Sequence, residues 1–72
     1  MDFNHFLTSY MPDTSIGSRQ HFKNMLEECV TAEKLGYATV SIPEHHLINL
    51  LMMPSPLQMA VKIASVTKKI KI

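Results

Sequence analysis

The sequence has few of the residues that hold very small domains together. Its single cysteine, Cys29, excludes a disulfide within the chain and fits a reducing compartment. Cys29 also lies on the apolar face of an expected helix, which predicts a packed thiol rather than a nucleophile. A chain of 72 residues that is 46% hydrophobic is marginal by itself, so we expect a piece of a larger domain.

Strong charge and long apolar runs are also missing. A formal net charge of +1 gives no electrostatic argument for binding nucleic acid or an anionic membrane. The apolar run Leu47–Met53 is interrupted by Asn49 and is too short to cross a bilayer, and the N-terminus lacks the basic region of a signal peptide. We therefore expect a cytoplasmic protein with no nucleic-acid partner and no membrane partner.

The chain has only two glycines, Gly17 and Gly36, and neither lies in a GxGxxG motif. A dinucleotide-binding sheet normally carries that motif after its first strand, so its absence favours a barrel over a Rossmann domain. The zinc signatures are absent as well. Adjacent side chains of an extended segment point to opposite faces, so His45 and His46 do not converge on one ion, and no metal site is predicted.

The hydrophobic pattern predicts strands that alternate with helices. We expect strands at 3–7 and 38–42, helices at 18–35 and 56–67, and the start of a third strand at 70–72. Ser18 and Ser55 are the expected N-caps, and Gln58 can complete a capping box with Ser55. The order β-α-β-α-β predicts an α/β fold with a parallel sheet. It fits the start of a TIM (β/α)8 barrel or of a doubly wound sheet, incomplete in this chain.

The helix expected at 56–67 is apolar on two sides. We name these sides the Leu57 stripe, with Leu57, Ala60, Val61 and Ala64, and the Met59 stripe, with Met59, Ile63 and Val66. One stripe can cover the sheet, and the other needs a second layer or another subunit. We predict that the Met59 stripe forms the subunit interface of a dimer.

The most informative segment is 37–46, in which a β-branched strand ends at Pro43 and leads directly into Glu44, His45 and His46. Enzymes with α/β folds place their chemistry at the carboxyl ends of strands, and histidine titrates near neutral pH. If the extended geometry continues through Pro43, His45 shares a face with Thr39 and Ser41. It then points into a barrel near its mouth as an acid, base or hydrogen-bond donor. The alternative is a histidine that caps the loop or the next helix.

Three further titratable residues have structural interpretations. His5 lies in the first strand, which can bring it near His45, and is expected to be a hydrogen-bonded strand histidine. His21, in the first turn of a helix, is expected to face solvent. Glu33 falls within the apolar stripe of the same helix and needs a partner if it is buried, so it is expected either to reach solvent at the helix end or to form a structural ion pair with a basic group rather than to act in catalysis.

Five short motifs occur in an order that resembles the bacterial luciferase-like monooxygenase family. They are Phe6–Tyr10, Ala32–Tyr37, Pro43–His46, Pro54–Pro56 and Thr67–Ile70. The glutamate followed by two histidines after the second strand is the most specific of them. The resemblance covers nearly all of this chain but only about the first quarter of a family member, because such a barrel needs about 250 residues.

The resemblance implies a TIM barrel that uses reduced flavin mononucleotide (FMN) and oxygen, or in some branches the deazaflavin F420. Family members oxidise small organic molecules such as aldehydes and sulfonates, and they dimerise through helices in this part of the chain. His45 matches a histidine of the flavin pocket that acts in catalysis as an acid or base. Glu44 and His46 match its neighbours in the cofactor site, and the role implied for Glu44 is structural.

Two departures from the family pattern limit what is expected of this chain. The loop Leu47–Met53 lacks the aromatic residue and glycine seen after the histidines in many members, which leaves the substrate open. The strands that bind the flavin phosphate are absent from the 72 residues, so we expect the chain itself to be inactive. The alternatives are an F420-dependent oxidoreductase of the same barrel, or a free-standing small α/β module that binds a partner through its open sheet edge.

Overall fold

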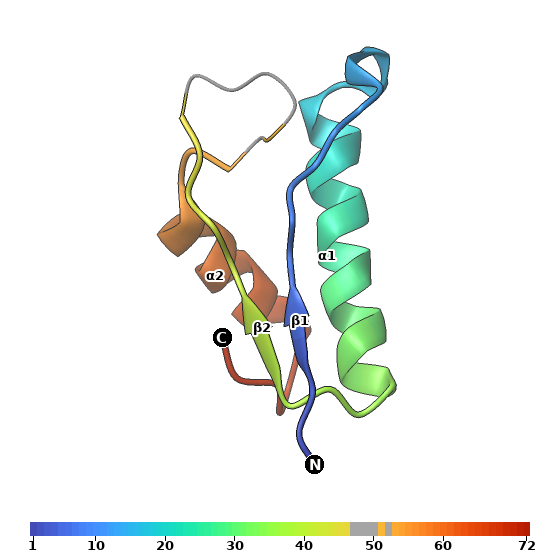
Figure 1. Ribbon diagram of the computed structural model, residues 1–72, viewed down its shortest axis with the longest axis vertical. Coiled ribbons are helices and arrows are strands. Elements are labelled where there is room, and N and C mark those ends of the chain that lie inside the picture. The colour runs from blue at the N-terminus through green and yellow to red at the C-terminus, as the bar shows by residue number, and fades with distance from the viewer. Residues whose placement is uncertain (47–50, 52) are drawn as a thin grey trace.

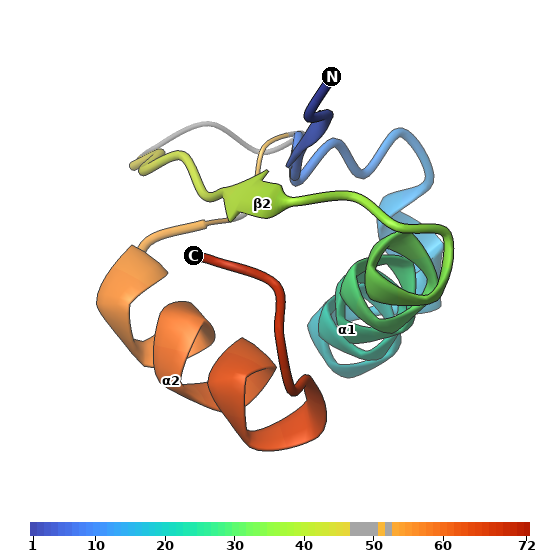
Figure 2. The same ribbon diagram turned by 90° about the horizontal axis from the view of Figure 1, so that it is seen from below.

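A computed structural model describes residues 1–46, 51 and 53–72. Its elements are β1 (Asn4–Phe6), a 3-10 helix η1 (Thr14–Ile16), α1 (Ser18–Lys34), β2 (Thr39–Ser41) and α2 (Pro56–Val66). Both helices lie on the same side of the strands, which makes a layer of strands and a layer of helices (Figures 1 and 2). This arrangement of strands and helices confirms the predicted α/β class. No described helix is long and apolar enough to cross a membrane.

The two strands pair in parallel, as the alternation of strands and helices predicts. The register pairs Asn4 with Thr39, His5 with Val40 and Phe6 with Ser41. On the other side of β2, Lys71 forms an isolated parallel bridge with Thr39: the Lys71 amide donates to Ala38 O at 3.0 Å, and the Val40 amide donates to Lys71 O at 2.7 Å. The segment expected to begin a third strand is therefore placed beside β2 by one bridge, and the described sheet has two strands.

Glycine rather than serine shapes both ends of α1. Gly17 occupies the N-cap position with φ 83°, a conformation that disfavours a side chain. Ser18 is the first helical residue and not the predicted N-cap. At the other end, Gly36 has φ 89°, and its amide donates to Glu33 O while the Tyr37 amide donates to Ala32 O. This is a Schellman motif, and it turns the chain from α1 into β2.

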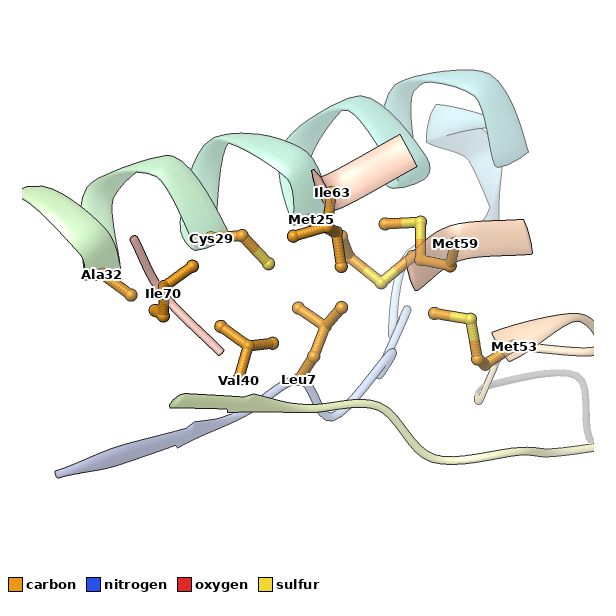
Figure 3. Close-up of a cluster of buried hydrophobic side chains, with 9 residues drawn as sticks. All are labelled: Leu7, Met25, Cys29, Ala32, Val40, Met53, Met59, Ile63 and Ile70. Carbon is orange, nitrogen blue, oxygen red and sulfur yellow. The ribbon is translucent and has the colours of Figure 1, made fainter. Parts of the chain in front are cut away.

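The core lies between the strands and the two helices. Its buried apolar side chains are Leu7, Met25, Cys29, Ala32, Val40, Met53, Met59, Ile63 and Ile70, and Figure 3 shows those of the strands facing those of the helices. The prediction for Cys29 is confirmed, because its side chain is fully buried. Burial, followed by the nearby charge of Glu28, raises the pKa of the Cys29 thiol to about 11.

The predicted orientation of α2 is wrong. Ile63 is 0% exposed and Met59 is 8% exposed, so these two residues of the Met59 stripe pack into the core and are not available for a subunit interface, whereas Val66 at the end of the stripe is 43% exposed. The Leu57 stripe faces outward instead, with Leu57 81% and Val61 71% exposed. Both stripes are apolar at helical spacing, so the period alone does not decide which one turns inward. In the fold, Met59 and Ile63 face the space between α1 and the strands, where they join the buried cluster.

The predicted cap of α2 is also only partly right. Ser55 occupies the N-cap position and Pro56 begins the helix, but the Ser55 side chain makes no capping hydrogen bond. The predicted capping box with Gln58 is therefore not formed. The first turn of α2 also contains no acidic residue, so neither a side-chain cap nor a nearby carboxylate compensates its N-terminus.

Glu33 binds backbone amides rather than the side chain of a basic residue, which corrects the expected ion pair. Its Oε2 accepts hydrogen bonds from the amides of Lys68, Lys69 and Ile70 at 2.8, 2.6 and 3.0 Å. These bonds, led by that of Lys69 and aided by the charge of Lys68, lower the pKa of Glu33 from its ordinary value of 4.5. The carboxylate thereby joins the end of α1 to the segment that leads to Lys71 beside β2.

We expect Glu33→Gln to lower the melting temperature of the chain by several degrees at pH 7. A glutamine oxygen accepts fewer and weaker hydrogen bonds than a carboxylate. Because the pKa of Glu33 is lowered on folding, its stabilising effect is present above pH 4.5 and is lost as pH falls through the folded-state pKa. The melting temperatures of the two proteins should therefore converge below pH 4.5. A constant difference from pH 7 to pH 3 would contradict this role.

Candidate functional site

The carboxyl ends of β1 and β2 lie at one edge of the sheet because the strands are parallel, and the loops that follow them meet there. An antiparallel bridge pairs Tyr10, after β1, with Leu51, after β2. A second bridge closes the β2–α2 loop on itself, with the His45 amide donating to Met53 O at 2.8 Å. The interrupted apolar run Leu47–Met53, whose sequence leaves the substrate open, lies mostly outside the described residues, which omit 47–50 and 52.

The two adjacent histidines have different surroundings. The Nε2 of His46 lies 2.6 Å from Oε2 of Glu44, and both side chains are more than half exposed. His45 is held through its backbone, its side chain is partly buried, and within the described part of the chain its imidazole has no hydrogen-bond partner. The arrangement thus engages Glu44 with His46 and not with His45.

The face of the sheet opposite the core is polar and open. The hydroxyls of Thr39 and Ser41 donate to Oδ1 of Asn4 at 2.6 and 3.0 Å, while Val40 between them is buried in the core. Phe6 extends the same face and is more than half exposed. The predicted alternation along β2 is therefore confirmed. That His45 continues on this face remains a prediction.

His5 lies away from the histidine pair at the strand ends. Its register partner is Val40, so it faces α1, and its Nε2 lies 3.3 Å from Oε2 of Glu28. This confirms a strand histidine with a structural partner. Among the residues that the structure describes, no group of three His, Cys, Asp or Glu side chains is placed to hold a metal ion.

A buried histidine supports the loop after β1. His21 is 5% exposed, which contradicts the predicted solvent exposure, and its Nε2–H donates to Ser9 O at 3.0 Å. Ser9 is itself buried and has φ 58°, a left-handed conformation that is uncommon for serine. His21 therefore holds a strained turn that precedes Tyr10 at the edge where the two loops meet.

The sequence contained a signal for this contact. His21 precedes Met25 by four residues and Cys29 by eight, so it extends the apolar face of α1 by one turn. The polarity of the His21 imidazole favours an exposed position. In the fold, however, the carbonyl oxygen of Ser9, 12 residues earlier, gives the ring a buried hydrogen-bond partner. A polar residue in phase with an apolar stripe is expected to be buried when the fold supplies such a partner.

We expect His21→Leu to destabilise the chain by about 1–3 kcal/mol, because it leaves the buried Ser9 carbonyl without a donor. His21→Gln retains an N–H donor and should recover part of the loss. Urea unfolding measures both effects, and amide hydrogen exchange at Tyr10 reports the loop directly. Equal stability of the leucine variant and the parent chain would show that the hydrogen bond contributes little.

Comparison with known proteins supplies the family. A sequence profile described as "Luciferase-like monooxygenase" matches residues 1–72, which is the whole chain. This chain belongs to the luciferase-like monooxygenase family. The "Uncharacterized protein y4vJ" of Sinorhizobium fredii (strain NBRC 101917 / NGR234) is 29% identical to it over 72 residues. That alignment covers 100% of this chain and 20% of the relative, so the chain spans about a fifth of the relative's length. No solved structure matches the chain.

Membership in the family agrees with the resemblance drawn from the motifs. Glu44, His45 and His46 lie at the carboxyl end of β2 as the motif order predicts. The roles of these three residues, the cofactor and the substrate go beyond what the family match establishes.

Proposed function

We propose that the chain is the N-terminal portion of a TIM-barrel monooxygenase that uses reduced FMN and oxygen to oxidise a small organic substrate. The carrying observation is the Glu44–His46 motif, which follows the second of two parallel strands in a chain matched over residues 1–72 by the luciferase-like family. The bridge that places Lys71 beside β2 supports the same barrel, because consecutive strands are neighbours in it. A cytoplasmic location belongs to the proposal, since Cys29 is a buried free thiol.

The residues on the open face of the sheet suit a flavin ring. Phe6 offers an exposed aromatic surface, and Asn4, Thr39 and Ser41 offer polar groups beside it. A flavin needs both, because its ring system is flat and largely apolar yet carries hydrogen-bonding atoms along one edge. In a closed barrel this face would point toward the interior, where it would contact the bound flavin. That contact would account for the aromatic and polar groups that are exposed in the present chain.

His45 is the residue that we assign to catalysis. When bound, reduced flavin would supply two electrons to oxygen, so that one oxygen atom is transferred to the substrate and the other leaves as water. His45 then donates or accepts a proton through its imidazole, which is partly buried and is not engaged by Glu44. Glu44 and His46 shape the rim of the cofactor site through their contact at 2.6 Å. The bridge to Met53 holds the backbone of His45 in place without using its ring.

The proposal is tested on an extended protein, in which residues 1–72 replace the matching stretch of the Sinorhizobium fredii relative. We expect it to bind reduced FMN in an anaerobic titration and to consume oxygen when a substrate from a panel of aldehydes and sulfonates is added. Tight binding of F420 with hydride transfer and no oxygen uptake would replace FMN by the deazaflavin. Binding of neither cofactor, with the barrel folded by circular dichroism, would overturn the proposal.

The exposed Leu57 stripe is the proposed dimer interface of helix 56–67. Leu57 and Val61 are both highly exposed on α2, and a fold with this apolar surface open to water gains stability by covering it. We expect Leu57→Glu with Val61→Lys to turn a dimeric extended protein into a monomer in sedimentation velocity. Gln58→Glu with Ser65→Lys, on neighbouring exposed positions of the same helix, is the control. A dimer that survives the first double substitution would exclude this interface.

A further inference from the structure

A groove on the helix layer has the features of a second binding site. It has a volume of about 580 Å³ and lies between the N-terminal halves of α1 and α2. Its apolar lining includes Phe22, Leu26, Met53 and Met59. In Figure 3, Met53 and Met59 lie at one end of the buried cluster, and Ala32 and Ile70 lie at the other. The groove therefore opens over the methionine-rich end of the core.

The charges around this groove have one sign. Arg19, Lys23 and Lys62 line it, and among the described residues no acidic side chain does so. The chain as a whole is nearly neutral, with seven basic and six acidic residues, so the excess of cations is local. Three cations beside an apolar floor are complementary to a molecule that combines a negative group with an apolar body.

The starts of both helices add to this complementarity. Ser18 and Ser55 line the same groove, where α1 and α2 begin. Neither helix has a side-chain capping hydrogen bond, and neither has an acidic residue in its first turn. The N-terminal amides of a helix favour an anion, and here two helices present them beside the three cations.

We propose that this groove binds a small organic anion, namely a carboxylate on an aromatic body of about two fused rings. The volume lies in the range of small-molecule sites. An aromatic body suits the lining, because the partly buried ring of Phe22 makes favourable contacts with aromatic rings and the buried Met53 and Met59 make the floor beneath it apolar. The carboxylate lies near Arg19 and Lys23, at the end of the groove where the helices start.

The site is independent of the function proposed above. It is lined by the helices and by residues 53–55, and it includes neither the histidine pair nor the open face of the sheet; the two sites share only Met53, whose backbone oxygen holds His45 and whose side chain lines the groove. Because all the residues that carry the argument lie in the described chain, binding is measured on the 72-residue chain itself. Loss of flavin binding in the extended protein would not affect the outcome.

The test compares 2-naphthoate with its neutral isostere 2-naphthamide by isothermal titration calorimetry at low salt. We expect naphthoate to bind about tenfold more tightly than naphthamide, which corresponds to two exposed charge interactions. Arg19→Gln with Lys23→Gln should weaken naphthoate binding about tenfold and leave naphthamide binding unchanged. Lys34→Gln with Lys71→Gln removes the same charge away from the groove and should have little effect.

Three results would overturn the proposal. They are equal affinity of the two probes, no binding of either at millimolar concentration, and an equal loss in both double variants. Circular dichroism and the melting temperature establish that each variant keeps the fold. If Arg19→Gln with Lys23→Gln does not fold, Lys23→Gln alone is used, because Lys23 is exposed and makes no hydrogen bond through its side chain within the described structure. Chemical shift changes of the Phe22 and Met59 signals then locate the bound naphthoate.

Discussion

We expect His45→Ala to lower the turnover of the extended protein by about 10²–10⁴-fold, the range that follows the removal of a general acid or base. The loss should fall on the rate at saturating substrate more than on flavin affinity. The backbone amide of His45 donates a hydrogen bond to Met53 O at 2.8 Å. His45→Ala removes only the ring and retains this hydrogen bond. The substitution therefore isolates the imidazole from the loop that carries it.

His46→Ala is the matched control, because it removes the same ring one residue further along the chain. The His46 side chain pairs with Glu44, and both are largely exposed, so its loss should reduce turnover far less. Steady-state rates and anaerobic flavin titrations of both variants give the comparison. If His46→Ala is the more damaging, the strand alternation does not continue through Pro43, and His46 rather than His45 faces the cofactor.

We expect Ile63→Ala to destabilise the chain by about 2–5 kcal/mol, the usual cost of truncating a fully buried isoleucine. Ile63 is 0% exposed and belongs to the same buried cluster as Leu7 and Met25. Truncation removes its apolar contacts and leaves a cavity that the surrounding side chains fill only in part. An effect of this size is a large fraction of the stability of a small domain.

Val61→Ala provides the comparison on the same helix. Val61 is highly exposed, and alanine has the higher helix propensity, so this variant should differ from the parent by less than about 0.5 kcal/mol. Urea unfolding followed by circular dichroism at 222 nm measures both variants. Similar losses in the two proteins would show that α2 is rotated relative to the present structure, with the Leu57 stripe turned toward the core.

Much of the architecture follows from local features of the sequence. The apolar spacing of Met25 and Cys29, with Gly36 after the last turn, predicts α1 and its end. The alternation of Thr39, Val40 and Ser41 predicts which side of β2 is buried. These features act over a few residues, through helical period, strand alternation and turn geometry. For the same reason the position of Glu44, His45 and His46 after β2 was predictable.

Other features were decided by contacts between distant parts of the chain. Both stripes of α2 are apolar, and only the space left by α1 and the strands selects Met59 and Ile63 for the core. His21 is buried because the turn at Ser9 offers it a carbonyl oxygen, and Glu33 is satisfied by amides 35 to 37 residues later. A polar side chain is buried or exposed according to the partner it finds, and that partner is brought near only when the chain folds.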